Sequence, residues 1–297
     1  MRTSLEREEI ADLGDPRLAD YRNLKDAELL LRRDRFIVEG RGNLRVLLAR
    51  TALRPDSLLL SQAAFAALEV DLASLGTESV AGGAARLAGV PVFVAKQAVL
   101  DAIVGFRVHR GALAVCRRPP PRDPRALAEA IVAGERAPRV VVLEGVRDAD
   151  NVGGIFRAAM ALGARAVFLC GQSCDPLYRK AIRTSMGGSL CVPFTRGGEA
   201  APLIEGLRAA GFGVLAFDPK PPGEVLGSAP SRLGGPLALL LGTEGEGLSA
   251  AALAGATRRV RIEMEPGVDS LNVAMAAAIG LHALRPPADA GRDLDGG

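Results

Sequence analysis

The sequence predicts an α/β protein, in which a small α/β sandwich is followed by a domain built on a parallel sheet. Short apolar segments alternate with helix-forming segments along the chain, which is the pattern of α/β folds. In the second half the apolar segments are nearly continuous, as strands covered on both faces are. The proline-rich stretch 117–124 fits neither a helix interior nor an inner strand and separates the halves. The expected parts are a first domain at 1–118, a linker at 119–137, a second domain at 138–286 and a disordered tail at 287–297.

The first domain contains helix and strand patterns in alternation. Its first helix is amphipathic, and the segment that follows, Phe-Ile-Val, is typical of a buried strand. The later elements follow the same order of apolar strand and periodic helix. The expected helices are 24–33, 44–49, 62–68 and 99–103, and the expected strands are 35–39, 57–60, 90–95 and 111–116.

The second domain has shorter and more apolar strands. They are separated by Ala-rich stretches that favour helix, which is the arrangement of a parallel sheet with helices on both faces. A short helix at 126–133 bridges the two domains. The expected strands are 140–143, 166–170, 214–217, 237–241 and 259–264, and an apolar helix then runs to about residue 284.

The composition excludes several classes of protein. The 297 residues are 48% hydrophobic and 24% charged, as in soluble globular proteins. Because no apolar run approaches ~20 residues and the first residues are polar and acidic, we expect no membrane span, no signal peptide and a cytoplasmic location. The four cysteines form no CxxC pair and only two histidines accompany them, so we expect buried, reduced thiols and no metal site.

The net charge of +3 neither proposes nor excludes a nucleic-acid partner, but the basic residues cluster locally. Six arginines stand against one acidic residue between positions 107 and 125. A second basic run lies at 179–183. Solvated surface charge explains such clusters as well as RNA phosphates do, and the scarcity of aromatic residues favours folded RNA over single strands. The candidate RNA contacts are Arg107, Arg110, Arg179, Lys180 and Arg183.

Ligands bind open parallel sheets where loops leave the carboxyl ends of the strands, and three such loops have unusual residues. The first follows the strand at 140–143. Asp150 or Asn151 is suited to cap the helix that follows, and two glycines leave its N–H groups accessible. Arg157 then lies about one turn inside that helix, where the dipole disfavours a cation, which suggests an anion nearby. An ordinary asparagine cap and a solvated arginine are the alternative.

The second loop, Gly242-Thr-Glu-Gly-Glu-Gly-Leu-Ser249, follows the strand at 237–241. It has the Gly-x4-Gly spacing of a phosphate loop, but Leu248 occupies the position of the lysine. Its two glutamates would repel phosphate and suit a cationic or hydroxyl-bearing ligand. A nucleoside triphosphate is therefore disfavoured, and glycines that serve only tight turns are the alternative.

The third loop precedes the last apolar helix. Ser270 is a natural N-cap for this helix. Asn272 gains nothing from helix propensity or packing at the start of an Ala, Val and Met helix, which points to a role in a site. The helix face expected to be buried consists of Leu271, Ala274, Met275, Ala278 and Ile279.

Together these loops resemble the three motifs of the SpoU-type (TrmH-like) RNA ribose 2′-O-methyltransferases of the SPOUT superfamily. Asn151-Val-Gly-Gly-Ile-Phe-Arg157 resembles the first motif, 241–249 the second, and Ile262-Glu-Met264 with Ser270-Leu-Asn-Val-Ala274 the third. The resemblance covers about 138–286. Less specifically, the first domain is similar to the L30e-like substrate-binding domain that precedes the catalytic domain in many members, through 35–40 and 109–114.

The resemblance implies S-adenosylmethionine as methyl donor, a C-terminal trefoil knot and a homodimer. The cofactor positions that it implies are Gly242, Ile262 and Leu271, with Glu244 and Met264 on the same loops. One residue departs from the family pattern: Glu263 stands where a proline usually lies between the Ile and the Met of the third motif.

The reaction implied is attack of a ribose 2′-oxygen on the sulfonium methyl group. Family precedent gives the main role to Arg157; a guanidinium holds its proton too tightly to act as a base, so we expect it to bind the target phosphate and stabilise the forming alkoxide. Asn151, Ser270 and Asn272 are expected to orient it.

Ribosomal RNA, of the large subunit (23S), is the expected substrate because of the L30e-like domain. The alternatives are tRNA, a base nitrogen as methyl acceptor, or an inactive ribosome-assembly factor of the same fold. A dinucleotide-dependent enzyme is disfavoured because the chain has no GxGxxG fingerprint.

Overall fold

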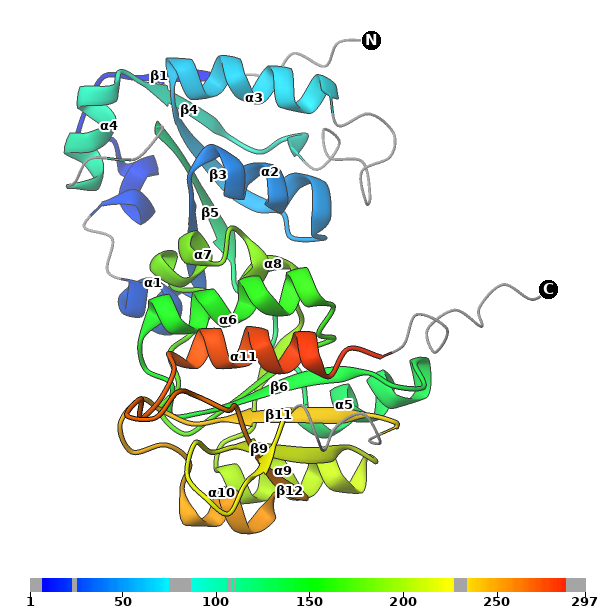
Figure 1. Ribbon diagram of the computed structural model, residues 1–297. Coiled ribbons are helices and arrows are strands. Elements are labelled where there is room, and N and C mark those ends of the chain that lie inside the picture. Colours follow the sequence, from blue (N-terminus) through cyan, green and yellow to red (C-terminus); the bar gives the residue numbers. More distant parts are fainter. Residues whose placement is uncertain are drawn as a thin grey trace. The chain divides into compact units, whose positions relative to one another are not determined.

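The computed structural model describes residues 7–22, 26–74, 87–105, 108, 111–226 and 234–286 (Figure 1). The chain forms two compact units. The first unit combines Met1–Pro120 with Pro176–Cys191, and the second combines Pro121–Asp175 with Val192–Gly297. The domain limits expected at 118 and 138 stay predictions, and the expected disordered tail at 287–297 falls outside the described residues.

The first unit is built on a mixed sheet of five strands in the order β1-β4-β3-β5-β2. β5 is antiparallel to β2 and β3, whereas β4 is parallel to β3 and β1. The strand β1 was not predicted, because three residues with two exposed glutamates carry little apolar signal. The strands are β1 (Glu8–Ile10), β2 (Arg35–Glu39), β3 (Pro55–Ser61), β4 (Val92–Ala95) and β5 (Ala112–Arg117).

Helices lie on both faces of this sheet, as the expected α/β sandwich requires (Figure 1). The 3₁₀ helix η1 (Pro16–Tyr21), α1 (Asp26–Arg33) and α4 (Gln97–Val104) share one apolar core with the strands. The helices α2 (Arg41–Arg50) and α3 (Gln62–Ser74) lie on the other face. Later in the sequence, α7 (Arg179–Thr184) packs on β2 and α8 (Gly188–Cys191) packs on α2, so this segment belongs to the first unit.

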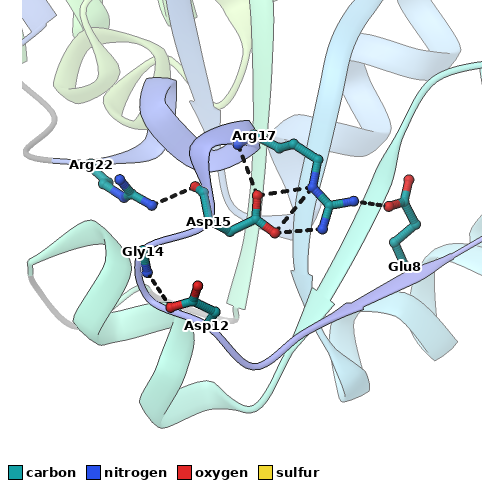
Figure 2. A network of polar contacts seen from close by, with 6 residues as sticks. All are labelled: Glu8, Asp12, Gly14, Asp15, Arg17 and Arg22. Carbon is teal, nitrogen blue, oxygen red and sulfur yellow. Dashed lines mark hydrogen bonds and ion pairs between the residues drawn. The ribbon is translucent and has the colours of Figure 1, made fainter.

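An ion-pair network holds the N-terminal segment (Figure 2). Arg17 pairs with Glu8 of β1 and donates to both oxygens of Asp15, through Nε at 3.0 and 3.1 Å and Nη2 at 2.5 Å. The guanidinium also lies over the ring of Phe93, 5.3 Å from its centroid. Its hydrogen bonds lower the pKa of Asp15 to about 2. This network ties β1 to η1.

The second unit is built on seven strands, all parallel, in the order β10-β12-β9-β11-β6-β7-β8, which confirms the predicted parallel sheet. The central strands β6 and β11 are almost completely buried. Two short edge strands, β8 and β10, were not predicted. The strands are β6 (Arg139–Glu144), β7 (Val167–Cys170), β8 (Phe194–Arg196), β9 (Gly213–Phe217), β10 (Glu224–Val225), β11 (Leu237–Leu241) and β12 (Arg258–Arg261).

Both faces of the parallel sheet are covered by helices (Figure 1). On one face α5 (Pro124–Gly134), α9 (Ala200–Ala209) and α10 (Ala250–Gly255) form a core with the strands. On the other, α6 (Ala149–Leu162) packs against α11 (Val273–Ala283). A Cβ at Gly154 of α6 would lie only 2.9 Å from the Cβ of Ala274, so this glycine permits the close approach of the two helices.

A buried arginine fastens the last helix. Arg139 begins β6, and its Nε donates to the carbonyl of Leu284 over 2.6 Å, just beyond α11. Its Nη1 donates to the carbonyl of Gly235 over 2.7 Å, just before β11. Burial lowers the pKa of this guanidinium. The carboxyl end of α11 is thereby fixed to two central strands, and the start of α11 can serve as a rigid part of a site.

The described residues contain no helix long and apolar enough to cross a membrane. All four cysteines are free, as predicted; Cys116, Cys170 and Cys174 are buried, whereas Cys191 is partly exposed. Burial raises the pKa of Cys170 to about 12 and moves that of Cys116 still further upward.

Candidate active site

A cavity of about 580 Å³ opens at the carboxyl ends of three neighbouring strands, β9, β11 and β12. Its volume lies within the ~300–1,000 Å³ range of cofactor sites. Loops after all three strands and the start of α11 form its walls. The lining residues are 217–220, 241–245, 247, 260–262, 264, 269–273 and 276.

All five predicted cofactor positions line this cavity: Gly242, Glu244, Ile262, Met264 and Leu271. Two of the predicted catalytic residues, Ser270 and Asn272, also line it. The sequence places β12 through residue 264, but the strand ends at Arg261, which leaves Ile262 and Met264 free to face the cavity. The departure from the family pattern, Glu263, is exposed and is not among the lining residues.

Sequence reasoning missed the wall after β9, formed by 217–220. This segment contributes Phe217 and the charged residues Asp218 and Lys220. Its place depends on the strand order, in which β9 lies between β11 and β12. The rule that ligands bind at carboxyl ends of parallel strands was the one signal that could have pointed to it.

The loop after β11 folds tightly back on itself. Thr243 and Gly247 form a bridge, and the N–H of Gly247 donates to the Thr243 carbonyl over 3.1 Å. A side chain at Gly242 would collide with the backbone of Gly247. Gly245 and Gly247 have positive φ, at 90° and 75°. The glycines thus allow a narrow turn whose backbone forms a wall of the cavity.

One amide connects all three predicted loops. The Asn272 Nδ2 donates to Asn151 Oδ1 over 2.8 Å and to Glu244 Oε1 over 2.9 Å. Its Oδ1 accepts the N–H groups of Ala274 and Met275, at 2.9 and 3.4 Å, so that it also caps α11. The predicted residues Asn151, Glu244 and Asn272 are therefore brought together, and Asn272 has a structural role that the sequence did not reveal.

The helix caps expected from the sequence were wrong. Asp148, rather than Asp150 or Asn151, caps α6, because its carboxylate accepts the N–H groups of both those residues. With the helix beginning at Ala149, Arg157 lies more than two turns inside it. The helix dipole is weak there, so the argument for an anion from that dipole fails. Arg157 is exposed and is not among the cavity-lining residues.

The N-cap of the last helix was also misplaced, since Asn272 and not Ser270 caps α11. The predicted buried face of this helix was also wrong. The side chains of Met275 and Ile279 are 61% and 39% exposed. The face that packs inward consists of Val273, Ala277, Gly280 and Leu281.

A second polar link joins the loop after β6 to the loop after β11. The carboxylate of Glu144, at the end of β6, accepts the Ser249 N–H over 2.9 Å and the Ser249 hydroxyl over 2.7 Å. The same hydroxyl oxygen caps α10 by accepting the Ala252 N–H over 3.1 Å. Ser249 is thus held from both sides.

The predicted RNA contacts divide into three groups. Arg107 and Arg110 lie outside the described residues. Lys180 and Arg183 are exposed on α7 of the first unit. Arg179, on the same helix, lies with its Nε 3.4 Å from Oε2 of Glu39, a side chain that is only 3% exposed. Arg179 is therefore partly committed to a buried carboxylate.

Comparison with known proteins agrees with this geometry. The SpoU rRNA methylase family matches residues 138–282. An uncharacterised tRNA/rRNA methyltransferase of Mycobacterium tuberculosis is 38% identical over 94% of this chain and 91% of its own length. A 23S rRNA (guanosine-2′-O-)-methyltransferase of Haemophilus influenzae is 30% identical over 66% of this chain and 78% of that protein.

The fold is shared with an AdoMet-bound rRNA methyltransferase from Sinorhizobium meliloti. The two are 24% identical, with a TM-score of 0.75 over 94% of this chain and 97% of the other. The match of 94% of this chain to the mycobacterial relative and of residues 138–282 to the family decides the assignment. The chain belongs to the SpoU rRNA methylase family, the SpoU/TrmH-type RNA methyltransferases of the SPOUT superfamily.

Proposed function

We propose that this protein transfers a methyl group from S-adenosylmethionine to a ribose 2′-hydroxyl of RNA in the cytoplasm, with 23S ribosomal RNA as the substrate. The observation that carries the proposal is the bonding of Asn272 to Asn151 and Glu244 at the edge of the cavity. It brings residues of the three loops together where five expected cofactor positions line one cavity. The relative of Haemophilus influenzae, whose name gives a 2′-O-methyltransferase of 23S rRNA, supports the same substrate.

The residues of the cavity suit S-adenosylmethionine. Gly242, Ile262 and Leu271 present backbone groups and apolar surface for an adenosine. The lining acidic residues Glu244 and Asp269 suit a cationic ligand rather than a polyphosphate. When bound, the cofactor supplies a methyl group on a sulfonium, which a ribose oxygen can displace.

Arg157 is proposed to bind the phosphate beside the target ribose and to stabilise the alkoxide that forms. It is exposed, so an RNA backbone can reach it. Guanidinium stays protonated at neutral pH, which suits charge stabilisation and not proton abstraction. The network through Asn272 holds Asn151, six residues earlier on the same helix, and so helps to orient α6.

A homodimer is part of the proposal. The exposed Met275 and Ile279 lie one helical turn apart on α11 and offer an apolar contact for a second copy. The exposed cations Lys180 and Arg183, together with Arg107, Arg110 and Arg179, are proposed to contact RNA phosphates.

The test is a map of ribose 2′-O-methylation across total RNA from cells with and without the protein. We expect one 23S rRNA position to lose its methyl group. Loss of a methyl group from a tRNA position instead would identify tRNA as the substrate. An unchanged map would favour an inactive assembly factor.

A further inference from the structure

We infer that Glu144 is a positioning residue for the methyl donor, acting through Ser249 on the loop 242–248. Resting on the proposed function, the inference assigns a role to a carboxylate that lies outside the lining of the cavity. Glu144 holds that loop in the form that accepts the donor.

The loop needs such an anchor because little inside it fixes its place. The turn is glycine-rich, and glycine gives up more conformational freedom on ordering than other residues do. Its internal contacts are the bridge between Thr243 and Gly247 and a long hydrogen bond, 3.5 Å, from the Thr243 hydroxyl to the Glu244 carbonyl. Five of its residues line the cavity: Gly242, Thr243, Glu244, Gly245 and Gly247. Any displacement of the loop therefore changes the donor site directly.

Two side-chain links hold the loop from outside. Near its start, Glu244 accepts the amide of Asn272 over 2.9 Å. Directly after its end, Ser249 donates its N–H and its hydroxyl to the two oxygens of Glu144, over 2.9 and 2.7 Å. Hydrogen bonds to a carboxylate are short and strong. The loop is thus fastened at both ends.

The two links lead to neighbouring parts of the chain. Glu144 ends β6 and begins the connection to α6, which carries Asn151 and Arg157. Asn272 bonds to Asn151 of that same helix. The loop 242–248 is therefore held in place against α6, the helix expected to bind the RNA. Glu144 makes this link at the end of a sheet strand.

The inference is tested by calorimetric titration of the full-length chain with S-adenosylhomocysteine, the demethylated product. Glu144→Ala should raise its Kd about tenfold, in line with the loss of two hydrogen bonds to a charged group. Glu144→Gln retains one acceptor oxygen and should restore about half of that loss on a logarithmic scale. The matched control is Glu205→Ala, an exposed glutamate of α9, which should bind as the wild type does.

A double-mutant cycle adds a second criterion. Ser249→Ala removes the hydroxyl bond, and the variant with both Glu144→Ala and Ser249→Ala should bind no worse than Glu144→Ala alone, because the residues act as one pair. Methyl-transfer assays should show a raised KM for the donor and a kcat within about twofold of the wild type once donor saturates.

A purely structural role would lower the melting temperature and leave the Kd unchanged well below it. A Kd of Glu144→Ala within twofold of the wild type, or a fall in kcat with unchanged Kd, overturns the inference. If Glu144→Ala does not fold, the same criteria apply to Glu144→Gln and Ser249→Ala. Failure of the wild-type protein itself to bind S-adenosylhomocysteine would instead contradict the proposed function.

Discussion

The side-chain amide of Asn272 donates to Asn151 Oδ1 over 2.8 Å. Asn151 is the first residue of the first predicted motif, and Asn272, in the third motif, caps α11. The same amide also reaches Glu244. Asn272→Asp keeps the capping oxygen but replaces the hydrogen-bonding NH₂ group with a carboxylate oxygen that faces the carboxylate of Glu244. We expect the affinity for S-adenosylhomocysteine to fall about tenfold.

The matched test of that prediction adds Glu244→Gln to Asn272→Asp. The pair then regains one donor and loses the repulsion, so affinity for S-adenosylhomocysteine should partly return. Equal affinities of the single and double variants in calorimetry would contradict the role assigned to this contact.

Arg157→Ala should abolish methyl transfer while the donor still binds. Its side chain is exposed and is not among the cavity-lining residues, so the Kd for S-adenosylhomocysteine should stay within twofold. Loss of one group that stabilises forming negative charge costs about a hundredfold or more in kcat. The control is Arg136→Ala, another exposed arginine of the second unit. Retained turnover in Arg157→Ala would refute the assignment.

Lys220 is predicted to bind the carboxylate of the methionine part of S-adenosylmethionine. The cations that line the cavity, as far as the structure describes it, are Lys220 and Arg261, and the Nε of Arg261 already donates to the Gly223 carbonyl over 3.2 Å. Lys220→Met should raise the Kd for S-adenosylhomocysteine about tenfold. Binding of 5′-methylthioadenosine, which lacks that end, should not change. Lys96→Met, in the first unit, is the control. Equal loss for both ligands would contradict a contact with the carboxylate.

The basic residues of α7 are expected to separate into structural and RNA-binding ones. Arg179→Met leaves the buried Glu39 without this partner and should lower the free energy of unfolding by about 3 kcal/mol. Adding Glu39→Gln should recover part of the loss. Arg183→Ala should leave denaturant unfolding unchanged and reduce the salt dependence of RNA affinity by up to about 0.9 per contact. An unchanged salt dependence of RNA affinity would show that Arg183 does not contact RNA phosphate.

Acid should selectively weaken the N-terminal network of the first unit. The hydrogen bonds of Arg17 hold the pKa of Asp15 at about 2, below its usual 3.8. A lowered folded-state pKa gives stability that is fully present above the usual value and is lost as the pH falls towards 2. The difference in melting temperature between wild type and Asp15→Asn should therefore shrink between about pH 4 and pH 2. A constant difference over that window would contradict the pairing.

The elements that the sequence predicts well are those with a strong local signal. The short runs of Val and Leu in β6 and β11 are buried on both faces, and such runs are typical of inner strands of a parallel sheet. β10 has two residues with neither side chain buried, so no apolar pattern marks it. The cavity wall at 217–220 depends on the order of strands, which is set by contacts distant in sequence.

The helix starts show a different limit. Asp148, Asp150 and Asn151 are all good capping residues, and the sequence offers no way to choose among them. The same ambiguity exists between Ser270 and Asn272. Because almost every residue of α11 is apolar, the sequence also does not show which face of that helix is buried. Motif positions could be predicted because they are read directly from the sequence, whereas the bonds that Asn272 makes required the fold.

The first unit has a consequence for biosynthesis, because part of it, Pro176–Cys191, is made after Pro121–Asp175, the first segment of the second unit. At a usual ~5–20 residues per second, the ribosome delivers Cys191 about 4 to 14 seconds after Pro120. Until then β2 lacks α7 and Glu39 lacks Arg179. The nascent first unit therefore keeps that surface uncovered until Pro121–Asp175 of the second unit has also been made, so it cannot finish folding before synthesis of the second unit has begun.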